Sequence, residues 1–223
     1  MRKVLVAPSI LACNENNLIK SVESIDGYAD FLHFDVMDGI FVPPTSFDEK
    51  LLDELHKHHK LINDVHLMVV NPDELVDKFA DAHADIITIH YEAFENEKDL
   101  IECIKHIKNR GVKAGLSIKP KTNAEDVFKF LPLLDLILVM SVEPGYGGQK
   151  FMLNAVDKIA KLRKYIDENN LKTLIEVDGG IKEDTAKLVK DAGIDVIVSG
   201  TFLFGHDDIL KRIEILKSWE LEF

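Results

Sequence analysis

Two polar side chains stand next to each other in an apolar stretch of the chain. The segment FLHFDVMDG, residues 31–39, is typical of a buried strand, yet it carries His33 and Asp35. Residues two positions apart in a strand point to the same face, so this imidazole and this carboxylate would lie side by side. Burying a charge is costly unless it is paired or bound to a metal. The pair therefore indicates a place where the chain does chemistry.

Two further strand-like segments end in residues of the same kinds. His66 lies in DVHLM, and Asp178 precedes the glycines of EVDGG. With the first pair they make two neutral imidazoles and two carboxylates, a ligand set for a divalent transition metal such as zinc, manganese, iron or cobalt. Taken singly, each has an ordinary explanation, because a strand-end histidine is often only hydrogen-bonded and an aspartate often caps the next segment. The convergence of four such residues from three strands favours a functional site.

The other histidines have less support as ligands. His90 also ends a predicted strand, and we interpret it as structural. Five more are interpreted as solvated residues on charged surfaces: His56, His58, His59, His83 and His106.

Short β-branched segments alternate with longer amphipathic segments along the chain. The predicted strands cover residues 4–9, 31–36, 62–68, 86–90, 113–118, 134–140, 173–177 and 195–199. The predicted helices cover residues 18–25, 48–59, 72–80, 97–109, 124–130, 154–168, 182–191 and 207–217. Eight near-continuously apolar strands, each followed by a helix, favour a parallel sheet covered on both faces.

The positions of the glycine-rich turns separate two architectures that fit this alternation. An open dinucleotide-binding sheet has its glycine-rich turn after the first strand, where this chain has APSILAC, without glycine. Here EPGYGGQ follows the sixth strand, DGG the seventh and SGT the eighth. A barrel binds phosphate with its last loops and places its chemistry at the carboxyl ends of its strands. We therefore predict a single (β/α)8 TIM barrel over residues 1–223.

Composition excludes several classes of function. The net charge of −12 argues against a nucleic-acid partner, because phosphate neutralisation needs a basic surface. The longest apolar run, residues 131–140, is far below the roughly 20 residues that a membrane span needs. Two cysteines without a CxxC pattern and no signal-peptide pattern predict a reduced, cytoplasmic setting.

With these motifs on the page, the sequence resembles the ribulose-phosphate 3-epimerase family over essentially its whole length. The matching segments are APSILAC (7–13), HFDVMDGIFVP (33–43), DVHLMV (64–69), MSVEPGYGGQKF (140–151) and EVDGGI (176–181). The resemblance implies a ribulose-phosphate-binding type of barrel that interconverts D-ribulose 5-phosphate and D-xylulose 5-phosphate in the pentose phosphate pathway. It implies proton transfer by two bases through an enediolate, a sugar-phosphate substrate as the partner, and assembly into a homo-oligomer.

The resemblance also assigns roles to residues. One divalent metal ion per subunit, with zinc favoured over iron, manganese or cobalt, would be held by His33, Asp35, His66 and Asp178. The catalytic acid/base residues would be Asp35 and Asp178. Three groups would bind the substrate: Ser9 and His66, the rim residues Met37, Met68 and Met140 around the intermediate, and the phosphate loops with Gly145, Tyr146, Gly147, Gly148, Gly179, Gly180, Gly200 and Thr201. Outside this context, a methionine on a strand is more often simple core filling.

Three departures from the family pattern leave the substrate open. Residues 44–47, PTSF, replace an asparagine-containing turn, Ile118-Lys119 replaces a small residue and asparagine, and Thr201 replaces a common serine. All three border the substrate in the family. A 3-epimerase of a ketohexose phosphate, such as D-allulose 6-phosphate, is therefore the alternative function.

Two other classes are weighed against the epimerase. Phosphate-binding barrels that decarboxylate or perform aldol chemistry use a strand-end lysine in an Asp-x-Lys-x-x-Asp pattern, and HFDVMD and DVHLM contain no lysine. A non-catalytic sugar-phosphate-binding barrel would be expected to lose one of the two aspartates, and both Asp35 and Asp178 are present.

Overall fold

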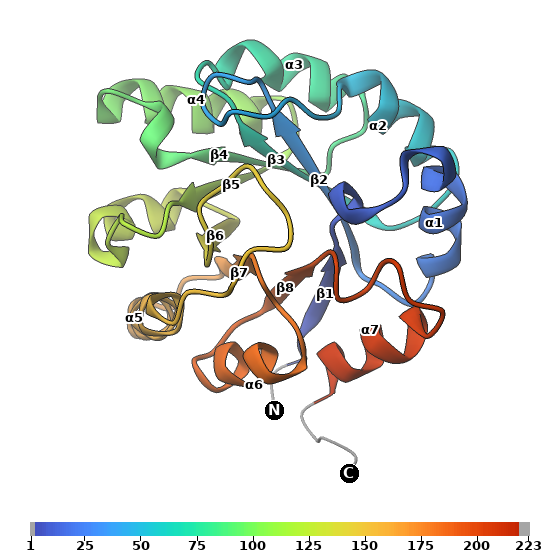
Figure 1. Cartoon of the computed structure of the whole chain (residues 1–223). Coiled ribbons are helices and arrows are strands. Elements are labelled where there is room, and N and C mark those ends of the chain that lie inside the picture. Colours follow the sequence, from blue (N-terminus) through green and yellow to red (C-terminus); the bar gives the residue numbers. More distant parts are fainter. Residues whose placement is uncertain (1–2, 219–223) are drawn as a thin grey trace.

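A computed structural model describes residues 3–218, and in it eight parallel strands form a barrel inside a ring of helices (Figure 1). The strands are β1 (Leu5–Pro8), β2 (Phe31–Met37), β3 (Ile62–Met68), β4 (Ile86–His90), β5 (Lys113–Ile118), β6 (Leu136–Met140), β7 (Leu174–Asp178) and β8 (Val196–Ser199). Their order around the sheet is β1-β8-β7-β6-β5-β4-β3-β2. The predicted TIM barrel is confirmed, and each predicted strand lies within two residues of its observed bounds.

Helices cover the outside of the barrel (Figure 1). They are α1 (Leu18–Ile25), α2 (Glu49–His56), α3 (Asp73–Asp81), α4 (Glu97–Asn109), α5 (Asn154–Glu168), α6 (Glu183–Asp191) and α7 (Ile209–Lys217). The helix expected between β5 and β6 is a 3₁₀ segment, Ala124–Leu133, with Pro132 inside it. Proline lacks the N–H that an α-helix needs in its interior, so Pro132 prevents regular α-helical hydrogen bonding in the last turn of this segment.

The barrel closes between β1 and β2 through contacts near their ends. Near the amino-terminal ends of these strands, the Asp30 amide donates to the carbonyl of Val6, and the Asp30 carboxylate accepts from the Val6 amide, both at 3.0 Å. Just beyond the carboxyl end of β1, Ser9 forms a parallel bridge with His33 of β2. The seam therefore places Ser9 beside the polar pair of β2.

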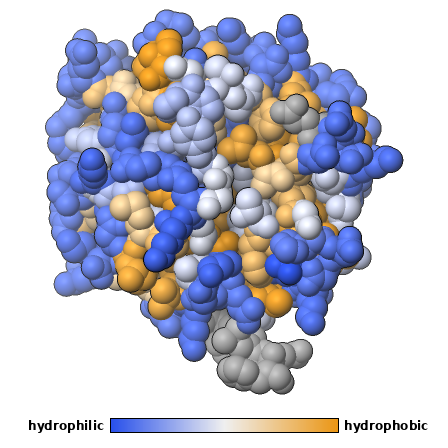
Figure 2. All heavy atoms as spheres, in the orientation of Figure 1, coloured by the Kyte–Doolittle hydropathy of each residue, from blue (hydrophilic) through white to orange (hydrophobic). Residues whose placement is uncertain are grey.

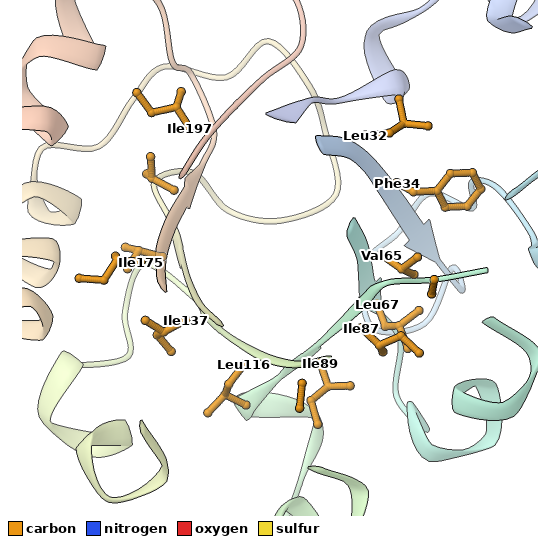
Figure 3. Close-up of a cluster of buried hydrophobic side chains, with 14 of the residues drawn as sticks. Leu32, Phe34, Val65, Leu67, Ile87, Ile89, Leu116, Ile137, Ile175 and Ile197 are labelled. Atoms are coloured by element: carbon orange, nitrogen blue, oxygen red, sulfur yellow. The ribbon is translucent and has the colours of Figure 1, made fainter. Parts of the chain in front are cut away.

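Alternation along the strands divides the apolar residues between two layers. The residues labelled in Figure 3, among them Phe34, Leu67 and Ile137, lie on the outer side of the strands and pack toward the helices. A second cluster fills part of the barrel interior with Ala7, Phe31, Ile86, Leu136, Leu138, Met140, Val142, Val196 and Val198. This burial of apolar surface supplies the main driving force for folding.

The rest of the barrel interior is polar. Inward positions of β2, β3, β4, β5 and β7 carry buried polar residues: His33, Asp35, Asp64, His66, Thr88, His90, Ser117 and Glu176. Buried polar groups need partners, so this concentration marks the part of the barrel where the fold serves something besides packing.

One expectation about the histidines is wrong. Helix α2 ends at His56, and His59 lies beyond it with a buried side chain. Its Nδ1 accepts a hydrogen bond of 3.0 Å from the amide of Leu61, which holds the ring against the turn that leads into β3. By contrast, His83 is exposed, and His106 lies at the surface between Asp73 and Asp77. Among residues 3–218, no helix has the length and apolarity of a membrane span.

Candidate active site

A pocket opens at the carboxyl ends of the strands and gathers nearly all the residues predicted to meet the substrate. Its lining includes Asp35 and Asp178 together with Ser9, Met37, Met68, Met140, Gly145, Tyr146, Gly147, Gly148, Gly179, Gly180, Gly200 and Thr201. The loop after β6 lies over the centre of the ring in Figure 1, and Figure 2 shows apolar residues and residues of intermediate hydropathy near the middle of this face, with hydrophilic ones around them. The predicted substrate residues therefore share one concave surface, with one exception.

That exception is His66, which is fully buried and reaches the pocket only through Asp35. Its Nδ1 lies 3.1 Å from Oδ1 of Asp35, and Nε2 of His33 lies 3.3 Å from the same oxygen. One ligand atom from each of His33, Asp35, His66 and Asp178 lies within 4.8 Å of the other three. The four predicted ligands therefore converge, as the sequence pattern required.

His33 shows most directly that this cluster suits a cation. Its Nδ1 lies 2.5 Å from Oδ2 of Asp64, so the proton of the ring is held on that side. Its Nε2 is buried and has no hydrogen-bond partner among the described residues. A buried polar nitrogen without a hydrogen-bond partner is costly, and a metal ion held beside Asp35 would give it one. The residues present thus fit a divalent metal, whose identity the donor set leaves open.

The charges of the two carboxylates lead to the same conclusion. Burial raises the pKa of Asp35, but the neighbouring imidazoles of His33 and His66 outweigh burial and hold it below its ordinary value. Burial, together with repulsion from Asp35, raises the pKa of Asp178 to about 6. Two carboxylates this close resist ionising together, and a cation between them removes that resistance.

Sequence reasoning missed a second layer of acidic residues behind the ligands. Asp64 precedes His66 by two positions and Glu176 precedes Asp178 by two, so both point into the barrel. Burial, and then the negative charge of Asp64, raises the pKa of Glu176 well above its ordinary value. The alternation that singled out His33 and Asp35 was signal enough to find these two as well.

Comparison with known proteins places the chain. The family profile described as "Ribulose-phosphate 3 epimerase family" matches residues 5–204. The Bacillus subtilis protein named ribulose-phosphate 3-epimerase is 40% identical over 218 residues, which cover 96% of this chain and 98% of the relative. The Mycobacterium tuberculosis protein of the same name is 39% identical, over 96% of this chain and 91% of the relative. The chain belongs to the ribulose-phosphate 3-epimerase family. The predicted family resemblance is thereby confirmed, and the family indicates an isomerase that acts on carbohydrate phosphates.

Solved structures match the fold of this family member more broadly. A mutant tryptophan synthase α-subunit from Pyrococcus furiosus superposes with a TM-score of 0.70 at 14% identity, over 96% of this chain and 97% of that one. At such low identity the likeness shows the barrel alone. The decisive distinction from other barrels comes from the family match and from the four converging side chains.

Ser46, which belongs to one of the departures from the family pattern, stabilises the backbone next to the site. The Ser46 hydroxyl donates to the carbonyl oxygen of Asp35 at 2.6 Å and accepts from the amide of Met37 at 2.9 Å. In the same loop, the carboxylate of Asp38 accepts from the amides of Ile40, Phe41 and Val70, each at 2.8 Å. These bonds fix the end of β2, and with it the backbone that carries Asp35.

The departure at Lys119 lies in the loop after β5 and contacts the loop after β2. Its ammonium group lies 3.8 Å from the centre of the Phe41 ring, a cation–π contact. Thr201, the third departure, lines the pocket itself.

Two glycines in the loops after β6 and β7 differ in whether a side chain would fit in their place. Gly180 has a φ of +64°, and a Cβ there would lie 2.6 Å from the Phe151 amide nitrogen, so only glycine fits. Gly147 lies in the pocket lining with no atom within 4 Å of its Cβ position. Gly180 is therefore required by the fold, whereas Gly147 leaves space that a ligand can use.

Proposed function

We propose that this chain catalyses the interconversion of D-ribulose 5-phosphate and D-xylulose 5-phosphate by inverting C3. The observation that carries the proposal is the placement of Asp35 on β2 and Asp178 on β7, both lining one pocket with ligand atoms within 4.8 Å. The 39–40% identity to proteins named ribulose-phosphate 3-epimerase supports the same reaction.

Inversion next to a ketone needs a proton removed from one face of the carbon and another delivered to the opposite face. One ionised aspartate takes the C3 proton, and the electron pair of that C–H bond moves toward the C2 carbonyl to give an enediolate. The other aspartate, protonated at that moment, donates its proton to the opposite face of C3. Two carboxyl groups that exchange these roles make the reaction run in both directions.

His33, Asp35, His66 and Asp178 would hold one divalent metal ion, with zinc first among the candidates. When bound, such an ion stabilises negative charge on the oxygens of the enediolate. Asp35 is held for its role from two sides, since Oδ2 accepts from the Ser9 hydroxyl at 2.8 Å while Oδ1 faces the histidines.

The apolar rim protects the intermediate from water. Met37, Met68 and Val42 pack together at the mouth, with Phe41 beside them. Met140 approaches from β6 and also lines the pocket. Excluding water strengthens the electrostatic interactions inside the site and prevents loss of the proton to solvent.

The phosphate would be bound by backbone N–H groups of the loops at Gly145–Gly148, Gly179-Gly180 and Gly200-Thr201, all of which border the pocket. Backbone amides bind an anion without basic side chains. That suits a chain with a net charge of −12.

A substrate panel tests the proposal against its alternative. The metal-loaded protein should epimerise D-ribulose 5-phosphate with a kcat/KM at least tenfold above that for D-allulose 6-phosphate. A preference for the ketohexose phosphate would transfer the reaction to the six-carbon substrate and leave the chemistry unchanged. The place in the pentose phosphate pathway, the cytoplasmic location and assembly into a homo-oligomer remain predictions, and sedimentation velocity measures the last of them.

A further inference from the structure

A chain of hydrogen bonds leads from the far side of His66 away from the pocket. Nε2 of His66 lies 2.9 Å from Nε2 of His90, and both side chains are fully buried. Nδ1 of His90 lies 3.1 Å from Oε2 of Glu92. The other oxygen of Glu92 accepts from the Lys119 amide at 2.7 Å and from the Thr122 hydroxyl. This series of hydrogen bonds thus joins β3, β4 and the loop after β5.

The groups that donate to Glu92 determine the direction of each hydrogen bond in this series. The Lys119 amide can only donate, so it fixes Oε1 of the Glu92 carboxylate as an acceptor. An ionised carboxylate also only accepts, so Nδ1 of His90 carries a proton toward Oε2. His90 is fully buried, which disfavours a charged ring, and a neutral ring with its one proton on Nδ1 has its lone pair on Nε2.

The next hydrogen bond leads to the four candidate metal ligands. Because Nε2 of His90 is an acceptor, Nε2 of His66 must donate its proton to it across 2.9 Å. The lone pair of His66 then lies on Nδ1, which is the atom 3.1 Å from Oδ1 of Asp35. His33 is fixed the other way round, since Asp64 holds its Nδ1 and leaves Nε2 for the cluster.

We propose that Glu92 and His90 are positioning residues that fix His66 as an Nδ1 metal ligand, an inference that rests on the proposed metal site. The carboxylate of Glu92 selects the tautomer of His90, and His90 selects the tautomer of His66. Partners of this kind orient metal-binding histidines and raise their basicity. His90, predicted from the sequence to be structural, then has a part in the function.

The loops around these hydrogen bonds keep other hydrogen-bonding groups away from His90. The ring of Phe41 packs on His90 with centroids 4.8 Å apart, and Lys119 lies over the same phenyl ring. Lys119, one of the family departures, and Thr122 both donate to Glu92 and so anchor these hydrogen bonds from the loop after β5. With Nε2 of His66 enclosed, His90 is the group that decides its protonation.

The substitution Glu92→Gln tests the proposal with almost no change of shape. The amide oxygen must still accept from the Lys119 amide, so the –NH₂ group faces Nδ1 of His90 and donates to it. The direction of every proton then reverses, and His66 carries its proton on Nδ1, where the metal would bind. Zinc affinity, measured by competition with a chelator, should fall at least about tenfold, within the 10–100-fold range for such partners.

Two further measurements sharpen the test. Nitrogen-15 NMR of the metal-free protein should find the His66 proton on Nε2 in the wild type and on Nδ1 in Glu92→Gln. His90→Phe, which removes the acceptor but keeps a ring against Phe41, should also weaken zinc binding. Glu95→Gln is the matched control, because it makes the same change on an exposed residue of the same loop and should bind zinc like the wild type.

The outcomes separate this inference from the proposed metal site. If the wild type binds zinc and Glu92→Gln binds it within twofold, with the His66 proton still on Nε2, the positioning role is overturned while the metal site stands. If the folded wild type itself fails to bind zinc, both the metal site and the inference are overturned.

Discussion

The hydroxyl of Ser9 donates a 2.8 Å hydrogen bond to Oδ2 of Asp35 across the seam where β1 meets β2. Both residues are buried, and Asp35 has its other oxygen turned to the two histidines. The contact between β1 and β2 therefore also orients one of the two proposed proton-transferring groups.

Removing this hydroxyl should reduce catalysis without emptying the metal site. A hydrogen bond to a charged group contributes about 1.5–3 kcal/mol, so Ser9→Ala should lower kcat/KM by about 10-fold or more. Metal content by elemental analysis should stay near that of the wild type. Ser24→Ala, on an exposed hydroxyl of α1, is the control. Wild-type kcat/KM in Ser9→Ala would show that the contact is only structural.

The metal should depend on His66. His66→Ala removes one of four converging ligands, and elemental analysis after dialysis should show the bound metal strongly reduced. His106→Ala changes a surface histidine of α4 that pairs with Asp73 and Asp77, and it should leave the metal content unchanged. Full retention of metal with normal activity in His66→Ala would refute the proposed metal site.

Metal binding should depend on pH with a change of slope near 6. Burial opposes a proton on His33, but Asp35 and Asp64 outweigh burial and raise the pKa of its imidazole above the ordinary value. Burial and Asp35 raise the pKa of Asp178 to about 6. Metal must displace a bound proton from each group, so affinity falls as pH falls.

The number of protons released sets the slope. Above pH 6 the metal displaces a proton from His33, whose pKa is raised, so the logarithm of its apparent affinity should rise with pH. Below pH 6 it also displaces the proton of Asp178, so the rise with pH should be steeper there. Isothermal titration calorimetry at pH 5 to 7.5 measures this. A pH-independent affinity over that range would contradict the coupled site.

The phosphate loops can be tested at Gly147, where the fold tolerates a side chain. No atom lies within 4 Å of a Cβ built there, so Gly147→Val should fold normally. If the backbone of this loop binds phosphate, the variant should raise KM for ribulose 5-phosphate several-fold more than it lowers kcat, as expected for lost uniform binding. An unchanged KM would place the phosphate elsewhere.

The barrel and the convergence of the four candidate ligands could be predicted because both depend on local patterns. Alternation within a strand assigns His33 and Asp35 to one face, and in a barrel such inward residues meet at the carboxyl ends of the strands. The same rule applied to DVH and EVD would have found Asp64 and Glu176.

The contacts between strands could not be predicted in this way. His66 lies opposite Asp35 on one side and Thr88 on the other, and this stagger of neighbouring strands is set by closure of the whole barrel. The link from His66 to His90, and the hydrogen bond from Ser9 to Asp35, both follow from that stagger. His59 was misjudged because the helix ends three residues earlier than the charge pattern indicates.

The central claim is that Asp35 and Asp178 move protons on opposite faces of C3, and isotope exchange with one base removed tests it most directly. Asp35→Asn and Asp178→Asn are prepared with metal content verified, because an empty site would imitate a lost base. Epimerisation should fall in both by about 10²–10⁴, as expected for lost acid–base catalysis. In deuterium oxide, each metal-loaded variant should still exchange the C3 proton of one epimer without forming the other, and the two variants should favour opposite epimers. Near-normal epimerisation by either metal-loaded variant would contradict the two-base account.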